Sequence, residues 1–176
     1  MFVGRDRELK KLETLYERGE FEFVVFYGRR RVGKTTLMNE FLKDKKSAYY
    51  MAVEGTKAEN LAGLSKSLLS IKGEGGALSS FPDFEVMLEY IDQLARSGER
   101  LVLAIDEFPY LAASYPAISS MLQSHIDHCW KDSRLFLILC GSSMSFMEEQ
   151  VLGYKSPLYG RRTAQFKLHP LSLIHI

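Results

Sequence analysis

The sequence predicts an α/β fold in which parallel strands form a central sheet and helices cover both of its faces. Apolar runs of strand length alternate with helical periodicities along the chain. Two of the expected strands, among them residues 135–140, are apolar at every position, which indicates burial on both faces. Repeated strand–helix–strand units are typical of sheets whose strands run parallel.

The expected helices carry apolar residues at spacings of three and four. They cover residues 9–16, 37–42, 61–69, 84–94 and 118–126. Glycines at 73–76 close the third helix, and Pro82 with Asp83 marks the start of the fourth. On the last of these helices, His125, His128 and Cys129 are close in sequence, but a packed helix surface is favoured over a metal site.

The expected strands are short apolar runs that alternate with these helices. They cover residues 23–27, 48–53, 101–105, 135–140 and, with weaker alternation, 163–168. In such sheets ligands bind at the carboxyl ends of the strands. The residues that follow each strand are therefore the candidates for function.

The composition indicates one ordinary globular domain. The chain has 176 residues, of which 46% are hydrophobic and 26% are charged, which suits a single core and excludes a disordered chain. Lysine and arginine number 23 against 22 aspartates and glutamates, so the net charge is +1. This balance argues against binding to nucleic acid or membrane through bulk charge.

The apolar runs, the N-terminus and the cysteines bear on where in the cell the protein is located. The longest apolar run, residues 135–140, is far too short to span a membrane, and the charged N-terminus does not read as a signal peptide. Cys129 and Cys140 are too few for a disulfide framework and are expected as reduced core thiols. We expect a cytoplasmic protein with no membrane partner.

The segment GRRRVGKTT, residues 28–36, follows the first expected strand and precedes a helix. It fits the Gly-x4-Gly-Lys-Ser/Thr pattern of a phosphate-binding loop in full. Glycines let backbone N–H groups turn towards phosphate oxygens, and the helix start adds its positive dipole end. Lys34 is expected to reach the β and γ phosphates of a nucleotide, and Thr35 to bind Mg²⁺ through its hydroxyl.

The whole loop supplies nucleotide-binding candidates. These are Gly28, Arg31, Val32, Gly33, Lys34, Thr35 and Thr36. For the three consecutive arginines at 29–31, a solvated surface that attracts phosphate over long range is favoured over specific contacts.

The third expected strand ends in Asp106 and Glu107. Two carboxylates at the tip of a buried strand are costly unless a partner binds them, and Mg²⁺ with a polarised water fits that need. Asp106 is the second metal candidate beside Thr35. Glu107 is expected to accept a proton from the water that attacks the γ phosphate, or to orient that water, as a catalytic residue alongside Lys34.

Two serines follow the fourth expected strand. Ser142 is a catalytic candidate that could hydrogen-bond the attacking water or the γ phosphate, and a role as a helix cap is equally open. For Ser143 the cap is favoured.

Four segments carry a resemblance to a known family. They are FVGRDREL at 2–9, the loop GRRRVGKT at 28–35, IDEFPYL at 105–111 and LYGRRT at 158–163. In these segments the chain resembles the archaeal-type ATPase domain, a prokaryotic P-loop family allied to the AAA+ and STAND ATPases. The resemblance extends over nearly the whole chain.

The resemblance implies a P-loop NTPase of the AAA+/ASCE type, a three-layer sandwich with a mostly parallel five-stranded sheet. One strand is expected between the strand before the phosphate loop and the strand that ends in Asp106. Val3, Gly4 and Arg5 become candidates for adenine contacts, with a plain helix start as the alternative. Arg161 becomes a candidate that responds to the γ phosphate, in its own subunit or a neighbour, with a surface arginine as the alternative.

Full members of the family continue into a winged-helix region, and this chain departs from them at its end. We expect an ATPase domain over residues 1–170 whose C-terminal lid is missing. Residues 171–176 read as a translated sequencing adapter and are interpreted as a non-native tail. The expected partners are nucleotide, the missing C-terminal domains in cis, and a second copy or another protein; nucleic acid is not indicated.

The predicted function is ATP binding and Mg²⁺-dependent ATP hydrolysis by a nucleotide-switch domain. A GTPase is disfavoured, because Asp106 is followed by Glu-Phe-Pro where GTPases carry x-x-Gly, and TKAE at 56–59 only approaches the guanine-binding pattern. A regulatory module that binds nucleotide without turnover is the other alternative. Retention of Lys34 and Glu107 argues against it.

Overall fold

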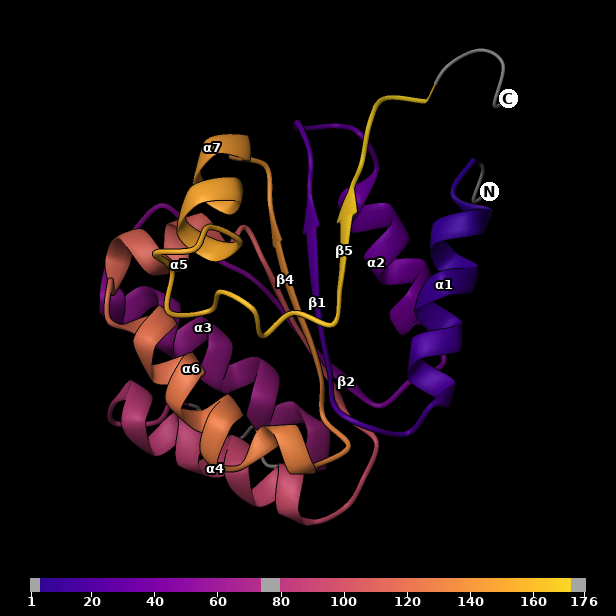
Figure 1. The fold of residues 1–176 in the computed structure, drawn as a ribbon. Coiled ribbons are helices and arrows are strands. Elements are labelled where there is room, and N and C mark those ends of the chain that lie inside the picture. Colours follow the sequence, from indigo (N-terminus) through magenta and orange to yellow (C-terminus); the bar gives the residue numbers. More distant parts are fainter. Residues whose placement is uncertain (1–3, 74–79, 172–176) are drawn as a thin grey trace.

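The computed structural model describes residues 4–73 and 80–171. Its centre is a sheet of five strands, all parallel, in the order β2-β3-β4-β1-β5 (Figure 1). The strands are β1 (Glu22–Tyr27), β2 (Ser47–Met51), β3 (Val102–Asp106), β4 (Phe136–Gly141) and β5 (Ala164–Lys167). The predicted fold class is confirmed, and β4 lies between β1 and β3 as the family resemblance implied.

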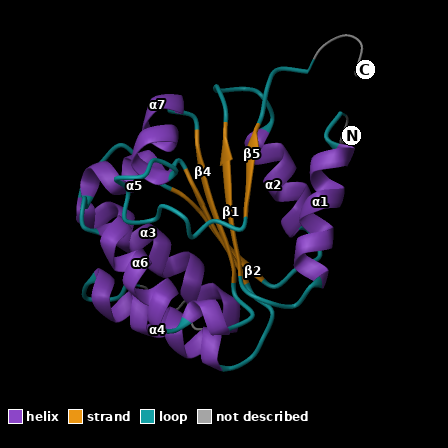
Figure 2. Cartoon of the chain, viewed as in Figure 1, coloured by secondary structure: helices purple, strands orange, loops and turns teal. Residues whose placement is uncertain are grey.

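Helices cover both faces of this sheet (Figure 2). They are α1 (Asp6–Glu17), α2 (Lys34–Leu42), α3 (Lys57–Leu69), α4 (Phe84–Arg96), α5 (Phe108–Ser114), α6 (Ile118–His128) and the short α7 (Met144–Phe146). Single turns η1 (Ser70–Lys72) and η2 (Trp130–Asp132) follow α3 and α6, and the π-helical turn η3 (Met147–Val151) follows α7. Helices α1 and α2 lie on one face, and α3 to α6 lie on the other.

Strand β1 shows why the central strands of this sheet are apolar at successive positions. Every residue of β1, β3 and β4 is buried. Within β1, Phe23 and Val25 join the core beneath α3 to α6, whereas Val24 and Phe26 join the core beneath α1 and α2. A strand whose side chains alternate between two cores requires apolar residues on both faces.

Two of the differences from the expected elements concern the segments beside Asp106 and Glu107. Strand β2 ends at Met51 rather than at residue 53, and the N–H of Ala52 makes the last hydrogen bond to β3, to the carbonyl of Asp106 at 2.9 Å. Helix α5 was not expected. It begins directly after Glu107 and has Pro109 in its first turn. Proline fits there because an N–H in the first turn would have no acceptor within the helix. The glycine segment expected at 73–76 lies, after Gly73, outside the described residues.

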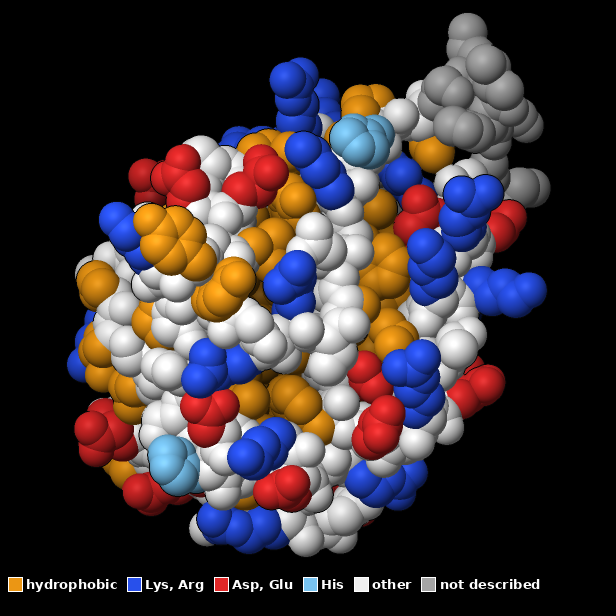
Figure 3. All heavy atoms as spheres, in the orientation of Figure 1, with side chains coloured by type: hydrophobic (Ala, Val, Ile, Leu, Met, Phe, Trp, Pro, Cys, Tyr) orange, Lys and Arg blue, Asp and Glu red, His pale blue; other side chains and the backbone are white. Residues whose placement is uncertain are grey.

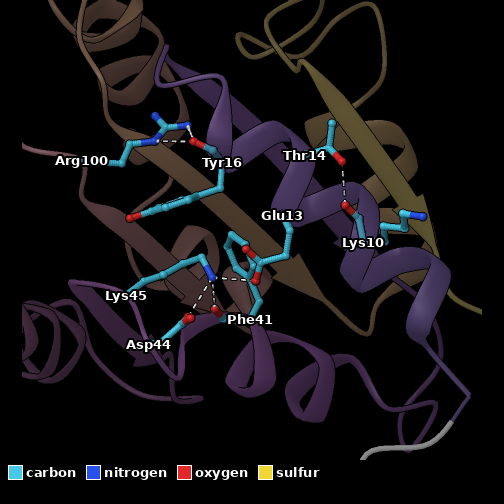
Figure 4. Close-up of polar contacts among 8 residues, drawn as sticks. All are labelled: Lys10, Glu13, Thr14, Tyr16, Phe41, Asp44, Lys45 and Arg100. Atoms are coloured by element: carbon cyan, nitrogen blue, oxygen red, sulfur yellow. Dashed lines mark hydrogen bonds and ion pairs between the residues drawn. The ribbon is translucent and has the colours of Figure 1, made fainter.

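Partly buried polar side chains fix the helices at the end of the sheet away from the phosphate loop. Arg100 donates to the main-chain carbonyl of Tyr16 (Figure 4) and to that of Leu15, and so caps the last turn of α1. Lys45 follows α2 and donates to Glu13 of α1 at 2.7 Å. These contacts tie α1 to α2 and to the segment that enters β3.

The indole of Trp130 is fully buried between α4 and α6 and anchors their packing. Its Nε1–H donates to Asp92 at 2.7 Å, and Nδ1 of His125 lies 2.8 Å from the same carboxylate. The histidine therefore belongs to a polar contact between α4 and α6. Among the described residues, no group of three or more histidine, cysteine, aspartate or glutamate side chains is placed to hold a metal ion.

Candidate nucleotide-binding site

The phosphate loop joins β1 to α2 at the carboxyl ends of the strands. A side chain at Gly28 would place its Cβ 2.4 Å from the carbonyl oxygen of Leu168, so only glycine fits beside the segment that follows β5. Gly33 has φ +95°, and Arg31 has φ +66°. These left-handed residues curl the backbone so that α2 begins with its N-terminus facing the loop.

The ammonium of Lys34 lies inside this loop. The residue is only 5% exposed, and its Nζ donates to the carbonyls of Gly28 and Arg29, both at 2.7 Å. The loop's own carbonyls thus solvate a buried charge. Lys34 also lines a cavity of about 370 Å³ together with Thr35, Thr36, Arg31 and Glu107.

Asp106 connects the phosphate loop to the end of β3 through several hydrogen bonds. The residue is 1% exposed, and its Oδ2 accepts hydrogen bonds from Thr35 Oγ1 at 2.8 Å and from the Tyr49 hydroxyl at 2.6 Å. Its Oδ1 accepts from the N–H of Glu107 at 2.9 Å. The structure therefore brings Thr35 and Asp106, the two magnesium candidates, into direct contact.

Glu107 projects from a strained backbone position. Its φ is +53°, in the left-handed region, and it occupies the N-cap position of α5. Its Oε2 accepts a hydrogen bond from Ser142 Oγ at 3.1 Å, across from the end of β4. Ser143 stands at the N-cap of α7 but makes no side-chain capping bond. The hydroxyl of Ser142 is thus directed at the carboxylate of Glu107.

Two loop residues are tied from outside the loop. Arg30 donates to the Tyr110 hydroxyl at 2.9 Å. Val32 is buried, and its carbonyl accepts from Arg5 at 2.6 Å. These bonds fix the outer arc of the loop to α5 and to the N-terminal segment.

Arg5 lies against the loop without entering the cavity that Lys34 lines. Its guanidinium, 6% exposed, bonds the carbonyls of Val32 and His169, while its buried Nε has no partner among the described residues. Gly4 and Arg5 line a separate cavity of about 410 Å³ beside His169. Arg5 precedes α1 but forms no side-chain cap. Val3 lies outside the described residues, and the adenine role of this segment stays a prediction.

The structure does not bring Arg161 to the phosphate loop of its own chain. Arg161 forms two hydrogen bonds with Asp127 of α6, at 2.9 and 2.7 Å. It lies just before Thr163, whose N–H bonds the carbonyl of Phe23 at the start of β1, whereas the loop follows the end of β1. A response to the γ phosphate within one subunit is therefore not supported, and a role towards a neighbouring subunit stays a prediction.

Sequence reasoning missed Tyr49. It lies in β2, one strand beyond β3, and reaches Asp106 because β2 and β3 pair in parallel with Tyr49 opposite Ala104. Burial, followed by the hydrogen bond to Asp106, raises the pKa of the Tyr49 phenol. The sequence around Tyr49 does not indicate this contact, because the contact depends on which strands are neighbours in the sheet, and local sequence does not determine strand order.

Replacing Tyr49 with phenylalanine is expected to lower the free energy of unfolding by about 1–3 kcal/mol, because a mostly buried carboxylate loses a donor. Since the folded-state pKa of Tyr49 is raised, this contribution is present below pH 10 and shrinks as pH rises and the unfolded tyrosine ionises. Urea denaturation at pH 7 and above pH 10 measures both effects. Tyr154→Phe, at a 75% exposed residue, is the control and leaves stability unchanged; equal effects of the two variants would contradict the assignment.

A model of a family of ATPase domains, predominantly from Archaea, matches residues 2–176. The chain is 38% identical over all 176 residues to uncharacterized protein MJECL04 of Methanocaldococcus jannaschii, and it covers 37% of that protein. It is 48% identical over 46 residues to the uncharacterized ATP-binding protein MJ0423 of the same organism, a match that spans 26% of this chain and 78% of the relative. The chain thus spans far less than the full length of MJECL04.

Solved structures share the fold. The Walker-type ATPase PABY2304 of Pyrococcus abyssi matches with a TM-score of 0.68 and 21% identity, over 97% of this chain and 55% of that one. The ORC2 protein of Aeropyrum pernix, in ADPNP–ADP complexes, matches with a TM-score of 0.65 and 19% identity, over 93% and 47%. In the part of this chain that the structure describes, no helix combines the length and apolar character needed to cross a membrane.

Proposed function

Because this chain belongs to the family of ATPase domains found predominantly in Archaea, we propose that it binds ATP with Mg²⁺ and hydrolyses the β–γ phosphoanhydride. One observation carries the proposal. Lys34, Thr35 and Glu107 line one cavity of about 370 Å³, and the hydroxyl of Thr35 is bonded to Asp106 at its edge. A cation, a hydroxyl and two carboxylates around one opening match what phosphoryl transfer to water requires.

The loop residues bind and orient the phosphates in this proposal. The ammonium of Lys34 exchanges the carbonyls of Gly28 and Arg29 for β- and γ-phosphate oxygens, while the backbone N–H groups up to Thr36 surround the phosphates. Thr35 and Asp106 would hold Mg²⁺, which supplies neutralising charge for the phosphates when bound. The donor set fits, because magnesium commonly takes one or two protein oxygens and completes its shell with phosphate and water.

Glu107 moves the proton. A water attacks the γ phosphorus, the bond from that phosphorus to the β–γ bridging oxygen breaks, and the water's proton passes to the Glu107 carboxylate, leaving ADP and inorganic phosphate. Ser142 orients the carboxylate through its 3.1 Å hydrogen bond and is a positioning residue in this scheme. Arg161 enters the proposal only across a contact between subunits.

Nucleotide preference is the direct test. We expect purified protein to bind ATP at least tenfold more tightly than GTP, and to need Mg²⁺ for turnover, because no guanine-reading pattern follows the loop. Titration calorimetry with each nucleotide, with and without Mg²⁺, measures this, together with phosphate release. Equal affinity for both bases would return the GTPase to consideration, and tight ATP binding without phosphate release would favour the non-hydrolysing module.

The greater length of MJECL04 supports a proposal about further domains in the same polypeptide. MJECL04 extends well beyond the matched region, so we propose that further domains in cis regulate the site. We also propose that the protein associates with itself, that it is cytoplasmic and that the ATPase domain ends near residue 170. Described residues reach Leu171, whose side chain packs close to Gly4.

A further inference from the structure

A second large hollow lies away from the nucleotide site, between β5 and α1. It has a volume of about 600 Å³. Its floor is made by Leu15 of α1 and by Ala164 and Phe166 of β5. Figure 3 shows hydrophobic side chains along this groove, bordered by lysine and arginine side chains. None of the proposed catalytic residues reaches it.

One wall of the groove is an unpaired strand edge. Strand β5 is last in the strand order, so within the described residues its outer edge pairs with no other strand. The N–H of Leu168 donates to the carbonyl of Tyr27 in β1 at 2.8 Å, and β1 and β5 pair with Phe26 opposite Phe166, so the alternation of a strand turns the backbone groups of Gln165 and Lys167 outward. Such an edge offers main-chain hydrogen bonds to another extended polypeptide.

The rim of the groove is positive. Arg7, Lys10, Lys11 and Arg18 all line it and are exposed, and none of the lining residues is acidic. The acidic neighbour Glu13 on α1 turns away to Lys45, whereas Lys10 extends towards β5 (Figure 4). A chain of net charge +1 thus gathers four cations beside one apolar strip.

We propose that this groove binds an extended acidic segment of a partner protein, which adds to the sheet as a sixth strand beside β5. Apolar side chains of that segment lie on Leu15 and Phe166, and its carboxylates face the cations of α1. The open strand edge and apolar floor favour polypeptide over nucleic acid, because phosphates would use the cations alone and leave the floor uncovered. The site is independent of ATP binding.

The probe is a fluorescein-labelled peptide of eight residues in which valine and glutamate alternate, measured by fluorescence anisotropy on the whole chain. We expect saturable binding that weakens about tenfold or more in Lys10→Glu/Lys11→Glu, since two favourable charge contacts become repulsive. The matched double change Lys66→Glu/Lys72→Glu, at exposed lysines of α3 and η1, is expected to alter affinity by less than about twofold.

A backbone variant separates strand addition from charge. Gln165→Pro removes an outward-facing N–H, which an edge strand tolerates, and we expect about tenfold weaker peptide binding with ATP affinity retained. The proposal is overturned if the peptide shows no saturable binding or if a peptide alternating valine with lysine binds as well. It is also overturned if a glycine–glutamate peptide binds equally, if the Lys10/Lys11 change has no effect, or if a DNA oligonucleotide binds this face and displaces the peptide.

Discussion

Phosphate release falls by about a hundredfold or more when Glu107 is replaced with glutamine, which is the typical loss when a general base is removed. The amide keeps the size of the carboxylate and an oxygen that accepts from Ser142, so the local contact at 3.1 Å survives. What disappears is the ability to take a proton from water. ATP affinity is therefore expected to stay within about threefold of the unmodified protein.

Steady-state phosphate release and calorimetric ATP binding measure the two quantities separately. Glu85→Gln, at an exposed residue in the first turn of α4, is the matched control and leaves both unchanged. Unchanged turnover in the Glu107 variant would remove this residue from its proposed role. Loss of binding together with turnover would instead assign it to holding the nucleotide.

Lys34→Ala acts at the preceding step and abolishes most of the binding itself. The ammonium is buried and contributes charge-assisted hydrogen bonds to the phosphates, and each such bond carries roughly 1.5–3 kcal/mol. Two of them correspond to a loss of ATP affinity of about a hundredfold or more. The exposed Lys43, at the other end of α2, offers the matched control Lys43→Ala.

Calorimetric affinity for ATP with Mg²⁺ checks this expectation, and urea denaturation shows whether the loop still folds. The second measurement is needed because Lys34 also bonds the carbonyls of Gly28 and Arg29 without nucleotide. ATP affinity that survived in a stable Lys34→Ala protein would refute the assignment of the phosphate cradle.

The sequence predicted the sheet and the phosphate loop because their determinants are local. Continuous apolar runs identify strands buried on two faces, and the spacing of Gly28, Gly33 and Lys34 encodes a loop geometry within a few residues. The rule that parallel strands end at one edge drew attention to both Thr35 and Asp106 as magnesium candidates, and the structure adds the direct hydrogen bond between them. The order of the strands came from the family resemblance rather than from the spacing.

Contacts between strands that are distant in sequence escaped prediction. Tyr49 meets Asp106 only because β2 pairs with β3 in one register, and Gly28 meets the Leu168 carbonyl only because β5 lies beside β1. Helix α5 was missed because the segment after Asp106 reads as a catalytic motif and lacks a long apolar period. The pairing of Arg161 with Asp127 of α6 also escaped prediction, because the two residues are 34 positions apart in the sequence.

At Glu107 the left-handed backbone conformation lowers the stability of the fold, while the side chain is the one proposed to act in hydrolysis. A side chain held in that conformation costs about 1–3 kcal/mol, and glycine is the residue that would relieve it. Glycine carries no carboxylate, so a substitution that relieves the backbone strain at Glu107 also removes the proposed catalytic base. Substitutions that raise the thermal stability of the domain without loss of the proposed activity therefore have to be made at other positions.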